Sequence, residues 1–363
     1  MPDDPSPIAQ RKADHIQLCA TGDVGFHQKT TLFEDVDFIH NALPELSVDS
    51  IDTSVVLLDK RLRAPILIAA MTGGTDRARE INLGLAEIAE ERGYGFGLGS
   101  QRPMLLAEEK TSTFAVREVA PTTLVLGNIG AVQARSLPTD AIAELSARVG
   151  ADAMCVHLNP AMEVIQPGGD RDFEGVLATL ERLTAELPWP IVAKETGCGI
   201  GPAAALRLSN AGVRHVDVSG AGGTSWVAVE TARTEADSRS LGEAFREWGV
   251  PTAASVAIAR RMRPRFKTII ATGGVSTGLH VAKAIALGAH AAGIARPVLQ
   301  AFVAGGKPAA VRLLAQVEAE LRTAMLLTGS RDIAALRKAP HLTLGRLRRY
   351  IQLTKSFDRD RRR

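Results

Sequence analysis

The chain is poor in aromatic side chains, which make up 4% of its 363 residues. Proteins that bind single-stranded nucleic acid stack the bases on such side chains, so this composition argues against that class. The formal net charge is only +3, and the basic residues are dispersed except at 260–265 and 359–363. We interpret these two clusters as solvated surface and a frayed terminus. We therefore expect no nucleic-acid partner.

Cysteine is also scarce, and long apolar runs are missing. Cys19, Cys155 and Cys198 form no CxxC pair and no metal-ligand spacing, which argues against a disulfide framework and favours a reducing compartment. No apolar run approaches the roughly 20 residues that cross a bilayer. The acidic, proline-rich start has no apolar signal core. These absences predict a soluble cytoplasmic protein with no stable membrane insertion.

What the chain does contain is a series of short apolar segments that each end in polar or glycine residues. Eight such segments separated by helix-like stretches are typical of a (β/α)8 TIM barrel, an α/β fold whose active site lies where the strands end. A doubly wound sheet is the competing architecture, but no GxGxxG fingerprint follows the first strand. The predicted strands begin at Pro65, Tyr94, Thr123, Ala153, Pro190, His215, Thr268 and Ala291.

The rest of the chain is organised around this barrel. We expect residues 1–10 to be disordered and 11–363 to form a single domain, with an N-terminal extension at 11–62 that has no strong strand. The sixth and seventh strand starts are farther apart than any earlier pair. The excess, residues 222–252, follows a strand and is predicted to be an active-site insertion. Residues 308–363 predict C-terminal helices, at 308–328 and 332–338, and a tail.

The last two predicted strands end in glycine-rich sequence. Gly273 and Gly274 end the seventh strand, Gly278 begins the following helix, and Ala295 and Arg296 end the eighth. Glycines allow backbone N–H groups to approach an anion, and a helix start adds the positive end of its dipole. TIM barrels commonly bind a phosphate at these two loops, so this pattern favours a phosphate site over simple tight turns.

Two further strand ends offer groups for a flat, anionic ligand. The first ends in Met71, Thr72, Gly73 and Gly74, whose small side chains and free amides suit the face of a ring. The fifth ends in Lys194, which points into the barrel mouth and needs an anionic partner such as a reduced flavin or a diphosphate. A structural pair with Glu195 is disfavoured, because neighbours on a strand face opposite ways.

The fourth strand ends in His157, Leu158, Asn159 and Pro160, with Glu163 one helical turn later. Asn159 and Pro160 are explained as a helix cap and first helical residue. That explanation leaves out His157, which faces the barrel mouth. Glu163 is either a solvated helix residue or a Mg²⁺ ligand, because Mg²⁺ takes one or two carboxylates together with phosphate oxygens.

Other candidates are weaker when taken singly. Ser100 and Arg102 end the second strand and suit a diphosphate, and Asn128 ends the third. Cys198 lies in the glycine-rich run TGCGIG, where we favour an inert loop cysteine over a nucleophile. No GxSxG elbow supports a serine hydrolase. The remaining candidates are Arg11, Lys12 and His15 in the N-terminal extension and Glu230 and Arg233 in the insertion.

Taken together, these motifs resemble the type 2 isopentenyl diphosphate isomerases, which are FMN-dependent TIM barrels. The likeness covers nearly the whole chain, and the set is far more specific than any one motif. The matching motifs include RKADHI (11–16), MTGGT (71–75), GLGSQR (97–102), GNIGAVQ (127–133), HLNPAMEVIQPGGD (157–170), KETGCGI (194–200), DVSGAGGTSW (217–226), ETAR (230–233) and ATGGVSTG (271–278).

The resemblance implies a role for each matching residue. FMN would be held by Thr72, Gly73, Gly74, Ser100, Asn128, Lys194 and Thr224, with its phosphate on Gly273, Gly274, Gly278, Ala295 and Arg296. A prenyl diphosphate would be bound by Arg11, Lys12, His15, Arg102, His157 and Asn159, with Mg²⁺ on Glu163. Catalytic roles would fall to Met162, Glu230, Lys194 and His157.

The reaction implied is a proton shift that converts isopentenyl diphosphate into dimethylallyl diphosphate without net redox change. It requires reduced FMN, for which NADPH can serve as reductant. Protonation of an alkene creates a tertiary carbocation, so the site must be dry and must stabilise positive charge. The family also tends to form homo-oligomers, here expected to be a tetramer or an octamer.

Two positions depart from the family pattern. Met162 stands where the family has glutamine, and a thioether donates no hydrogen bond. Val275 and Ser276 stand where isoleucine and arginine are common. The ordinary isomerase is the leading hypothesis. The alternatives are a member that isomerises or cyclises a longer prenyl diphosphate, a non-catalytic binding protein, and a flavin oxidoreductase of the hydroxy-acid or dihydroorotate type.

Overall fold

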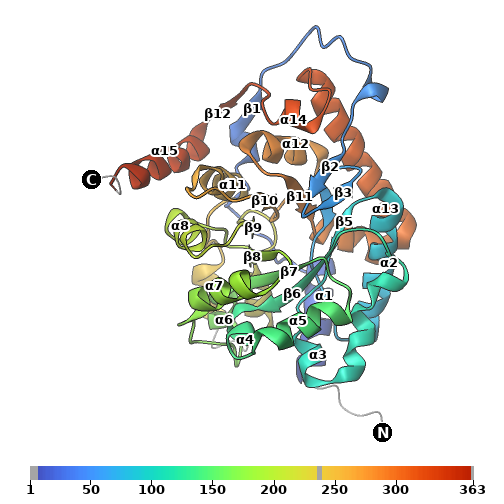
Figure 1. Cartoon of the computed structure of the whole chain (residues 1–363), viewed down its shortest axis with the longest axis vertical. Helices are drawn as coiled ribbons and strands as arrows, with labels where there is room; N and C mark the ends of the chain where they lie inside the picture. Colours follow the sequence, from blue (N-terminus) through green and yellow to red (C-terminus); the bar gives the residue numbers. More distant parts are fainter. Residues whose placement is uncertain (1–6, 235–238, 361–363) are drawn as a thin grey trace.

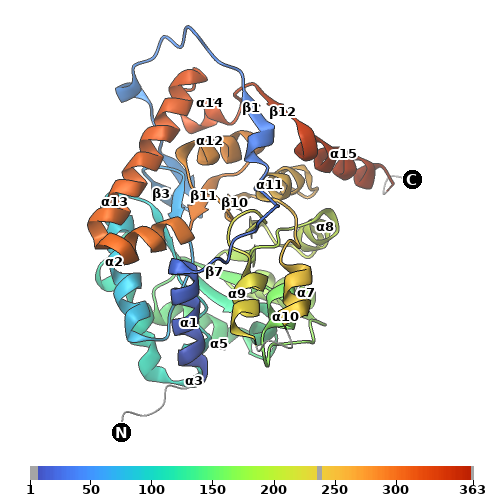
Figure 2. The ribbon, with the colours of Figure 1, turned by 180° about the vertical axis from the view of Figure 1, so that it is seen from behind.

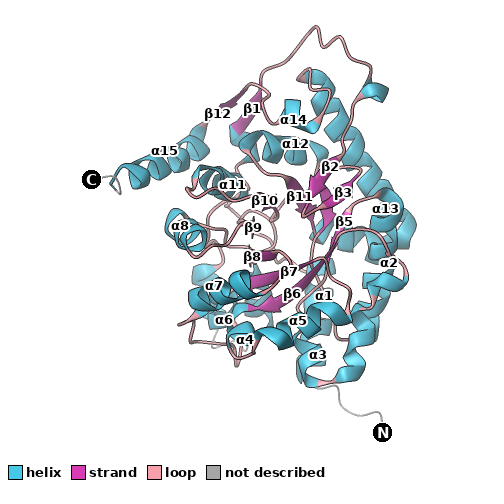
Figure 3. Ribbon diagram, viewed as in Figure 1, coloured by secondary structure: helices cyan, strands magenta, loops and turns pink. Residues whose placement is uncertain are grey.

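A closed barrel of parallel strands runs through the chain, and helices surround it (Figures 1 and 3). The computed structural model describes residues 7–234 and 239–360. Each barrel strand pairs with the next along the chain, and the last pairs with the first, which confirms the predicted TIM barrel. The barrel strands are β4 (Ile66–Ile68), β5 (Gly95–Gly97), β6 (Val125–Gly130), β7 (Ala153–Leu158), β8 (Ile191–Glu195), β9 (His215–Asp217), β10 (Thr268–Ala271) and β11 (Ala291–Ile294).

The alternation of side chains along these strands places polar groups at the barrel mouth. Leu126, Cys155 and Val192 belong to one buried cluster inside the barrel. Because side chains on a strand repeat their direction every second residue, the positions two residues further along also face inward. On β6, β7 and β8 these positions are Asn128, His157 and Lys194. The inward-facing residues therefore form an apolar core inside the barrel and a polar site at its mouth.

Helices cover the outside of the barrel and bury the other face of its strands (Figure 3). Helix α2 shows how the sequence sets their ends, because Thr75 Oγ1 accepts a hydrogen bond from the N–H of Ala78 and Gly93 ends the helix in the left-handed conformation. Apart from the two helices of the insertion, the described α-helices between barrel strands are α2 (Asp76–Arg92), α3 (Arg102–Leu106), α4 (Ala131–Arg135), α5 (Thr139–Arg148), α6 (Pro160–Ile165), α7 (Val176–Glu186), α8 (Pro202–Asn210), α11 (Thr252–Arg261) and α12 (Gly278–Leu287).

The N-terminal extension differs in two respects from the prediction. Helix α1 (Pro7–Thr21) begins inside the stretch 1–10 that was expected to be disordered, and residues 1–6 lie outside the described part of the chain. The extension also contains short strands: β1 (Val36–Phe38), β2 (Val55–Leu57) and β3 (Lys60–Leu62). Leu57 and Leu62 of the β2–β3 hairpin join the buried cluster inside the barrel, so this part of the extension closes it from below.

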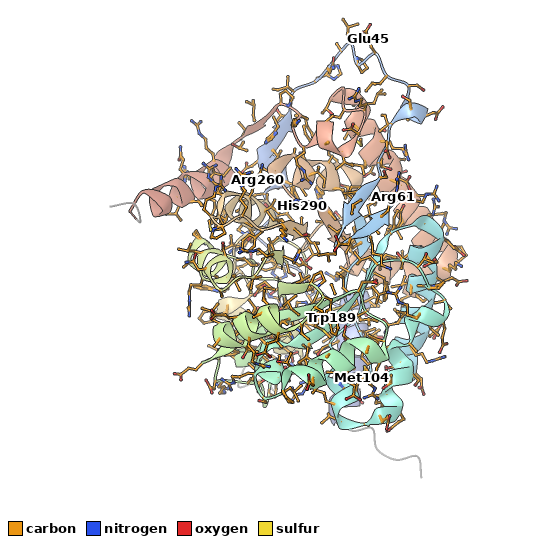
Figure 4. The ribbon with its side chains drawn as sticks, in the orientation of Figure 1. Glu45, Arg61, Met104, Trp189, Arg260 and His290 are labelled. Carbon is orange, nitrogen blue, oxygen red and sulfur yellow. The ribbon has the colours of Figure 1, made fainter. Side chains whose placement is uncertain are left out.

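The C-terminal region is more helical than predicted. Helix α13 (Arg296–Leu327) starts well before residue 308 and is interrupted at Gly305 and Gly306, whose backbone angles are not helical. It is followed by α14 (Ile333–Leu336), β12 (His341–Thr343) and α15 (Gly345–Asp360). Strand β12 pairs with β1, so the N-terminal extension and the C-terminal region meet in a small two-stranded sheet away from the barrel. Figure 4 shows Glu45 at the outer tip of the segment that follows β1.

The insertion after the sixth barrel strand forms helices α9 (Trp226–Arg233) and α10 (Arg239–Phe245), while residues 235–238 lie outside the described part. Seen from behind the view of Figure 1, α9 and α10 lie on the same side of the barrel as α1 (Figure 2). Helices α1 and α9 are in contact. Within the described ranges, none of the helices combines the length and apolar character that a membrane span requires.

Candidate functional site

A cavity of about 420 Å³ opens at the carboxyl ends of the barrel strands, which is the volume of a small-molecule site. Residues from α1, from the barrel loops and from the insertion all line it. Most residues expected at the site are among them: Arg11, Lys12, His15, Thr72, Ser100, Arg102, Asn128, His157, Asn159, Met162, Glu163, Lys194, Thr224, Gly273, Gly274, Ala295 and Arg296.

Four expected residues do not line the cavity. The backbone of Gly73 and Gly74 packs against Phe114 and Pro103, because a Cβ at either position would collide with those rings. The N–H of Gly278 donates to Glu320 Oε2 at 2.7 Å, so it is already used within the protein. Glu230 has no exposed surface and lies behind His15. These four residues are therefore not part of the cavity wall, and the roles expected for them stay predictions.

Glycines shape one wall of the cavity. Gly273 and Gly274 have φ angles of 93° and 70°, in the left-handed region that favours glycine. The backbones of Gly223 and Gly274 approach so closely that a Cβ on Gly223 would lie 2.3 Å from the Gly274 nitrogen. A wall without side chains lets a ligand approach the main chain closely. This arrangement fits a phosphate, as the sequence predicted, and Val275 and Ser276 extend the same wall.

Two buried polar atoms at the cavity have no hydrogen-bond partner in the part of the chain that the structure describes. Thr72 Oγ1 and Arg11 Nε are shielded from solvent and form no hydrogen bond. Both residues line the cavity. Since buried polar groups are almost always hydrogen-bonded, these atoms indicate a polar ligand that supplies the missing partners. The residues present therefore fit a phosphate-bearing cofactor such as FMN.

The side chain of Arg296 makes contacts that the sequence did not predict. Its guanidinium donates to the carbonyl oxygens of Cys19 at 3.0 Å and Gly22 at 2.5 Å. Gln300 donates to Ala20 O beside it, at 3.2 Å. Together they hold the carboxyl end of α1 over the cavity. The guanidinium thus binds the end of α1 through Nε and Nη2, and Arg296 also lines the cavity.

Lys194 has a protein partner that sequence reasoning missed. Its ammonium lies 3.1 Å from Asp217 Oδ2, and Thr272 Oγ1 donates to Asp217 Oδ1 at 2.6 Å. Asp217 is only 4% exposed. The signal was available, because Asp217 is a carboxylate at the carboxyl end of a predicted strand. Glu195 does not pair with Lys194 through its carboxylate, which instead accepts backbone N–H groups of residues 197–199.

Asn128, which was expected to hold FMN, also orients the side chain of His157. Its Nδ2 donates to Leu98 O at 3.0 Å, which leaves Oδ1 to face His157 Nδ1 at 2.9 Å. Because Oδ1 can only accept, the histidine proton lies on Nδ1. Burial lowers the pKa of His157 to about 3, and the nearby charges of Lys12 and Lys194 act in the same direction. His157 is therefore neutral at physiological pH.

Glu163 lies in a small polar network at the start of α6. Its Oε1 accepts from Asn159 Nδ2 at 2.7 Å, and its Oε2 accepts from the N–H of Asp170 at 2.9 Å and from Gln166 Nε2 at 3.3 Å. Within the described ranges, no group of three or more acidic, histidine or cysteine residues forms a metal cage. Glu163 suits Mg²⁺ only where a ligand phosphate and waters complete the coordination.

Cations from α1 and α3 meet at one side of the cavity. Arg11, Lys12 and Arg102 all line it. Burial lowers the pKa of Lys12 to about 8, and the charges of Arg11 and Arg102 add to this effect. Burial and Arg102 likewise lower the pKa of Arg11. Three mutually repelling cations are stabilised by a polyanion, which makes this the natural place for a diphosphate.

Helix α1 is joined to the insertion by an ionic network. His15 Nε2 lies 2.7 Å from Glu230 Oε1, and Arg233 bridges Glu230 Oε2 at 2.7 Å and Asp14 Oδ2 at 3.1 Å. The His15 ring also packs edge-on against Trp226, with centroids 5.2 Å apart. Trp226 lines the cavity and was not singled out from the sequence. Its position in the predicted insertion was the available signal.

Met162 lines the cavity beside the Glu163 network. Its Sδ lies 3.9 Å from Asn159 Nδ2, which is a weak contact. Ile16, Met71 and Leu299 line the same cavity and provide apolar surface. Cys198 is not a lining residue, and burial raises its pKa. Its expected inert role agrees with that position.

Comparison with known proteins agrees with this geometry. A family model described as FMN-dependent dehydrogenase matches residues 156–343. The isopentenyl-diphosphate delta-isomerase of Methanosarcina barkeri is 43% identical over 95% of this chain and 95% of its own length. The isopentenyl-diphosphate delta-isomerase of Halobacterium salinarum is 42% identical over 96% of this chain and 97% of its own.

Solved structures of mandelate oxidase share the same architecture. One of them, a variant with an FMN adduct, has a TM-score of 0.61 and 19% identity, covering 90% of this chain and 95% of its own. Another, with (S)-2-phenylpropionate, has the same TM-score and identity. At this level of identity the likeness shows the fold alone.

Proposed function

Since this chain belongs to the type 2 isopentenyl diphosphate isomerases and is therefore an isomerase of the FMN-dependent class, we propose that it converts isopentenyl diphosphate into dimethylallyl diphosphate. The reaction is a proton shift with no net redox change, on reduced FMN and with Mg²⁺. NADPH serves only to reduce the cofactor. The observation that carries the proposal is that Arg11, Lys12 and Arg102 line the same cavity as the glycine backbone of Gly223, Gly273 and Gly274.

FMN would be held by groups around the cavity, one of which has no hydrogen-bond partner among the described residues. Thr72 Oγ1 is buried without a hydrogen bond, and the amides near Gly273 and Gly274 form a wall suited to the phosphate. Lys194 would face the ring from the barrel floor, with Ser100 and Thr224 also lining the cavity. When bound, reduced FMN would supply an electron-rich surface and a proton-transfer group for the alkene.

The diphosphate would bind at the cations of α1. Arg11, Lys12 and Arg102 supply charge, and His15 and Asn159 line the cavity close by. Glu163 would hold Mg²⁺ together with diphosphate oxygens, because its carboxylate is already oriented by Asn159 Nδ2 at 2.7 Å. This anchoring would fix the position of the alkene, and binding energy at the diphosphate would thus assist the reaction at the other end.

The protein would also keep the alkene dry. Helix α1, held by Arg296 and by the His15–Glu230 contact, covers the cavity together with α9. Ile16, Met71 and Leu299 provide apolar lining for the hydrocarbon chain. His157 is fixed in its neutral form by Asn128, so it adds no positive charge near a developing carbocation.

A second candidate is a reaction on a longer prenyl diphosphate. Met162 motivates this candidate, because its flexible, polarizable thioether lines the cavity and can adapt to a longer prenyl group. The ordinary isomerase ranks first, since every cation assigned to the diphosphate is present and lines the cavity. In either case we expect a cytoplasmic homo-oligomer, a tetramer or octamer, which size-exclusion chromatography with light scattering would measure.

The experiment is an anaerobic incubation with FMN, NADPH and Mg²⁺ in D₂O, supplied with isopentenyl diphosphate and followed by NMR. Deuterated dimethylallyl diphosphate is the expected product. Bound, reduced flavin with no deuterium exchange would overturn the ordinary isomerase. Products from geranyl or farnesyl diphosphate under the same conditions would then favour the longer-chain alternative, and no product from any prenyl diphosphate would favour a non-catalytic binding protein.

A further inference from the structure

Asp217 lies beneath the cavity and not in its wall. It ends β9 and is 4% exposed. Its neighbours Lys194 and Thr272 both line the main cavity, while Asp217 borders a separate space of about 10 Å³ below it, together with Cys155. Asp217 therefore cannot touch a ligand directly and acts through the groups above it.

The contacts of Asp217 join three neighbouring strands. Oδ2 accepts from the Lys194 ammonium of β8 at 3.1 Å, and Oδ1 accepts from Thr272 Oγ1, just after β10, at 2.6 Å. The N–H of Ser219 also approaches Oδ1, at 3.3 Å. A carboxylate held on both oxygens has one orientation. It therefore provides a fixed anchor for the flexible lysine side chain.

Lys194 is the single cation that the structure places in contact with Asp217, within the described ranges. The other titratable group at this point is Cys155, whose pKa burial raises to about 12, so it carries no charge. The ammonium makes one further contact, to the carbonyl oxygen of Glu195 at 3.2 Å. Asp217 thus both points the ammonium and compensates its charge.

We propose that Asp217 is a positioning residue that aims the Lys194 ammonium at the cofactor and limits the positive charge presented there. The inference rests on the proposed function only in taking FMN as the occupant. The ring of reduced FMN is anionic, whereas the ring of oxidised FMN is neutral. Asp217 compensates part of the positive charge of Lys194. The charge that remains therefore determines how much more tightly the protein binds reduced FMN than oxidised FMN.

The test compares FMN affinity in both oxidation states. Asp217→Asn removes the charge and retains the shape, so the ratio of the dissociation constants for oxidised and reduced FMN should rise at least tenfold. For a two-electron couple this equals a potential about 30 mV more positive. In a Lys194→Met background, Asp217→Asn should change the ratio less than threefold, because the charge that Asp217 compensates is gone.

Asp217→Glu distinguishes the effect of the carboxylate's position from the effect of its charge. It also provides a second variant if Asp217→Asn does not fold. It retains the charge but moves the carboxylate, so affinity for both forms should fall more than threefold while the ratio stays within threefold of the wild type. Unchanged affinity in Asp217→Glu would overturn the positioning role. An unchanged ratio in Asp217→Asn, or the same shift in the Lys194→Met background, would overturn the charge role.

These readouts need no prenyl diphosphate and no turnover. A wild-type protein that binds FMN but fails to isomerise would overturn the proposed function and leave this inference open to the same affinity test. A wild-type protein that binds no FMN would overturn both.

Discussion

His15 Nε2 lies 2.7 Å from Glu230 Oε1, and this contact joins the N-terminal helix to the insertion over the barrel mouth. Glu230 is completely buried. Burial acts to raise its pKa, but the hydrogen bond and charge of His15 and the ion pair with Arg233 outweigh it, so the pKa lies below its usual value. Glu230 is thus an anion that holds a cavity residue, a role distinct from contact with the ligand.

Glu230→Gln should therefore loosen α1 without altering the cavity wall. We expect about a tenfold loss of inorganic pyrophosphate affinity, which corresponds to about 1.4 kcal/mol, together with faster hydrogen exchange across residues 10–21. Glu243→Gln is the matched control, because Glu243 lies in the same insertion and its side chain is 54% exposed. Slow exchange at α1 and unchanged pyrophosphate affinity in Glu230→Gln would contradict the account.

Met162→Gln should accelerate deuterium incorporation from isopentenyl diphosphate. An amide both donates and accepts hydrogen bonds next to Asn159, whereas the thioether lies 3.9 Å from that nitrogen and accepts only weakly. Met162→Leu is the control, since it removes the sulfur at similar volume and should leave the rate within a factor of two. A Met162→Gln rate equal to or below that of the wild type would show that the amide is not limiting.

The pKa of Lys12, lowered to about 8, predicts a pH-dependent affinity for diphosphate. Binding of an anion raises the pKa of Lys12, so affinity is full below pH 8 and falls as the free protein loses its proton above pH 8. The loss approaches tenfold per pH unit. Titration of pyrophosphate from pH 7 to 9.5 measures it. Lys12→Arg, whose charge persists in this range, should bind with a flatter profile, and parallel curves would refute the prediction.

Glu163→Gln should weaken Mg²⁺ more than it weakens the diphosphate itself. The carboxylate is oriented by Asn159 and Gln166, and a neutral amide is a poor Mg²⁺ ligand. We expect the Mg²⁺ concentration for half-maximal pyrophosphate binding to rise at least tenfold, measured by calorimetry. Glu174→Gln, at an exposed position nearby in the chain, is the control and should titrate like the wild type. An unchanged Mg²⁺ dependence would remove Glu163 as the ligand.

Much of the fold and the cavity could be predicted from the sequence, because strand periodicity carries both. On a strand, every second residue faces the same way. Asn128, His157 and Lys194 each lie at an inward-facing position near the end of their own strand, so the strand pattern is enough to place them at the barrel mouth. The start of α1 at Pro7 was not predicted from the sequence, because a short, proline-rich N-terminal segment is typical of disorder. In the structure α1 as a whole contacts α9 and α13. The part of α13 before residue 308 was also not predicted, because the non-helical Gly305 and Gly306 interrupt the helical pattern.

The partners of the site residues were harder to predict than the residues themselves. Arg296 was expected at the cofactor phosphate, and its guanidinium also binds the carboxyl end of α1. Gly278 was expected there too, and its N–H donates to Glu320. Both contacts were missed for the same reason, because the groups that accept these hydrogen bonds come from segments far away in the chain. Asp217 was missed for the same reason, since its role depends on contacts from two neighbouring strands.

The central claim is that an FMN-dependent barrel here performs a reaction with no net redox change. The most direct measurement counts dimethylallyl diphosphate formed per NADPH oxidised, under strict anaerobiosis with excess isopentenyl diphosphate. The account predicts many product molecules for each NADPH, because the cofactor is reduced once and then retained. One NADPH consumed for each substrate molecule transformed would contradict it and would show a flavin oxidoreductase instead.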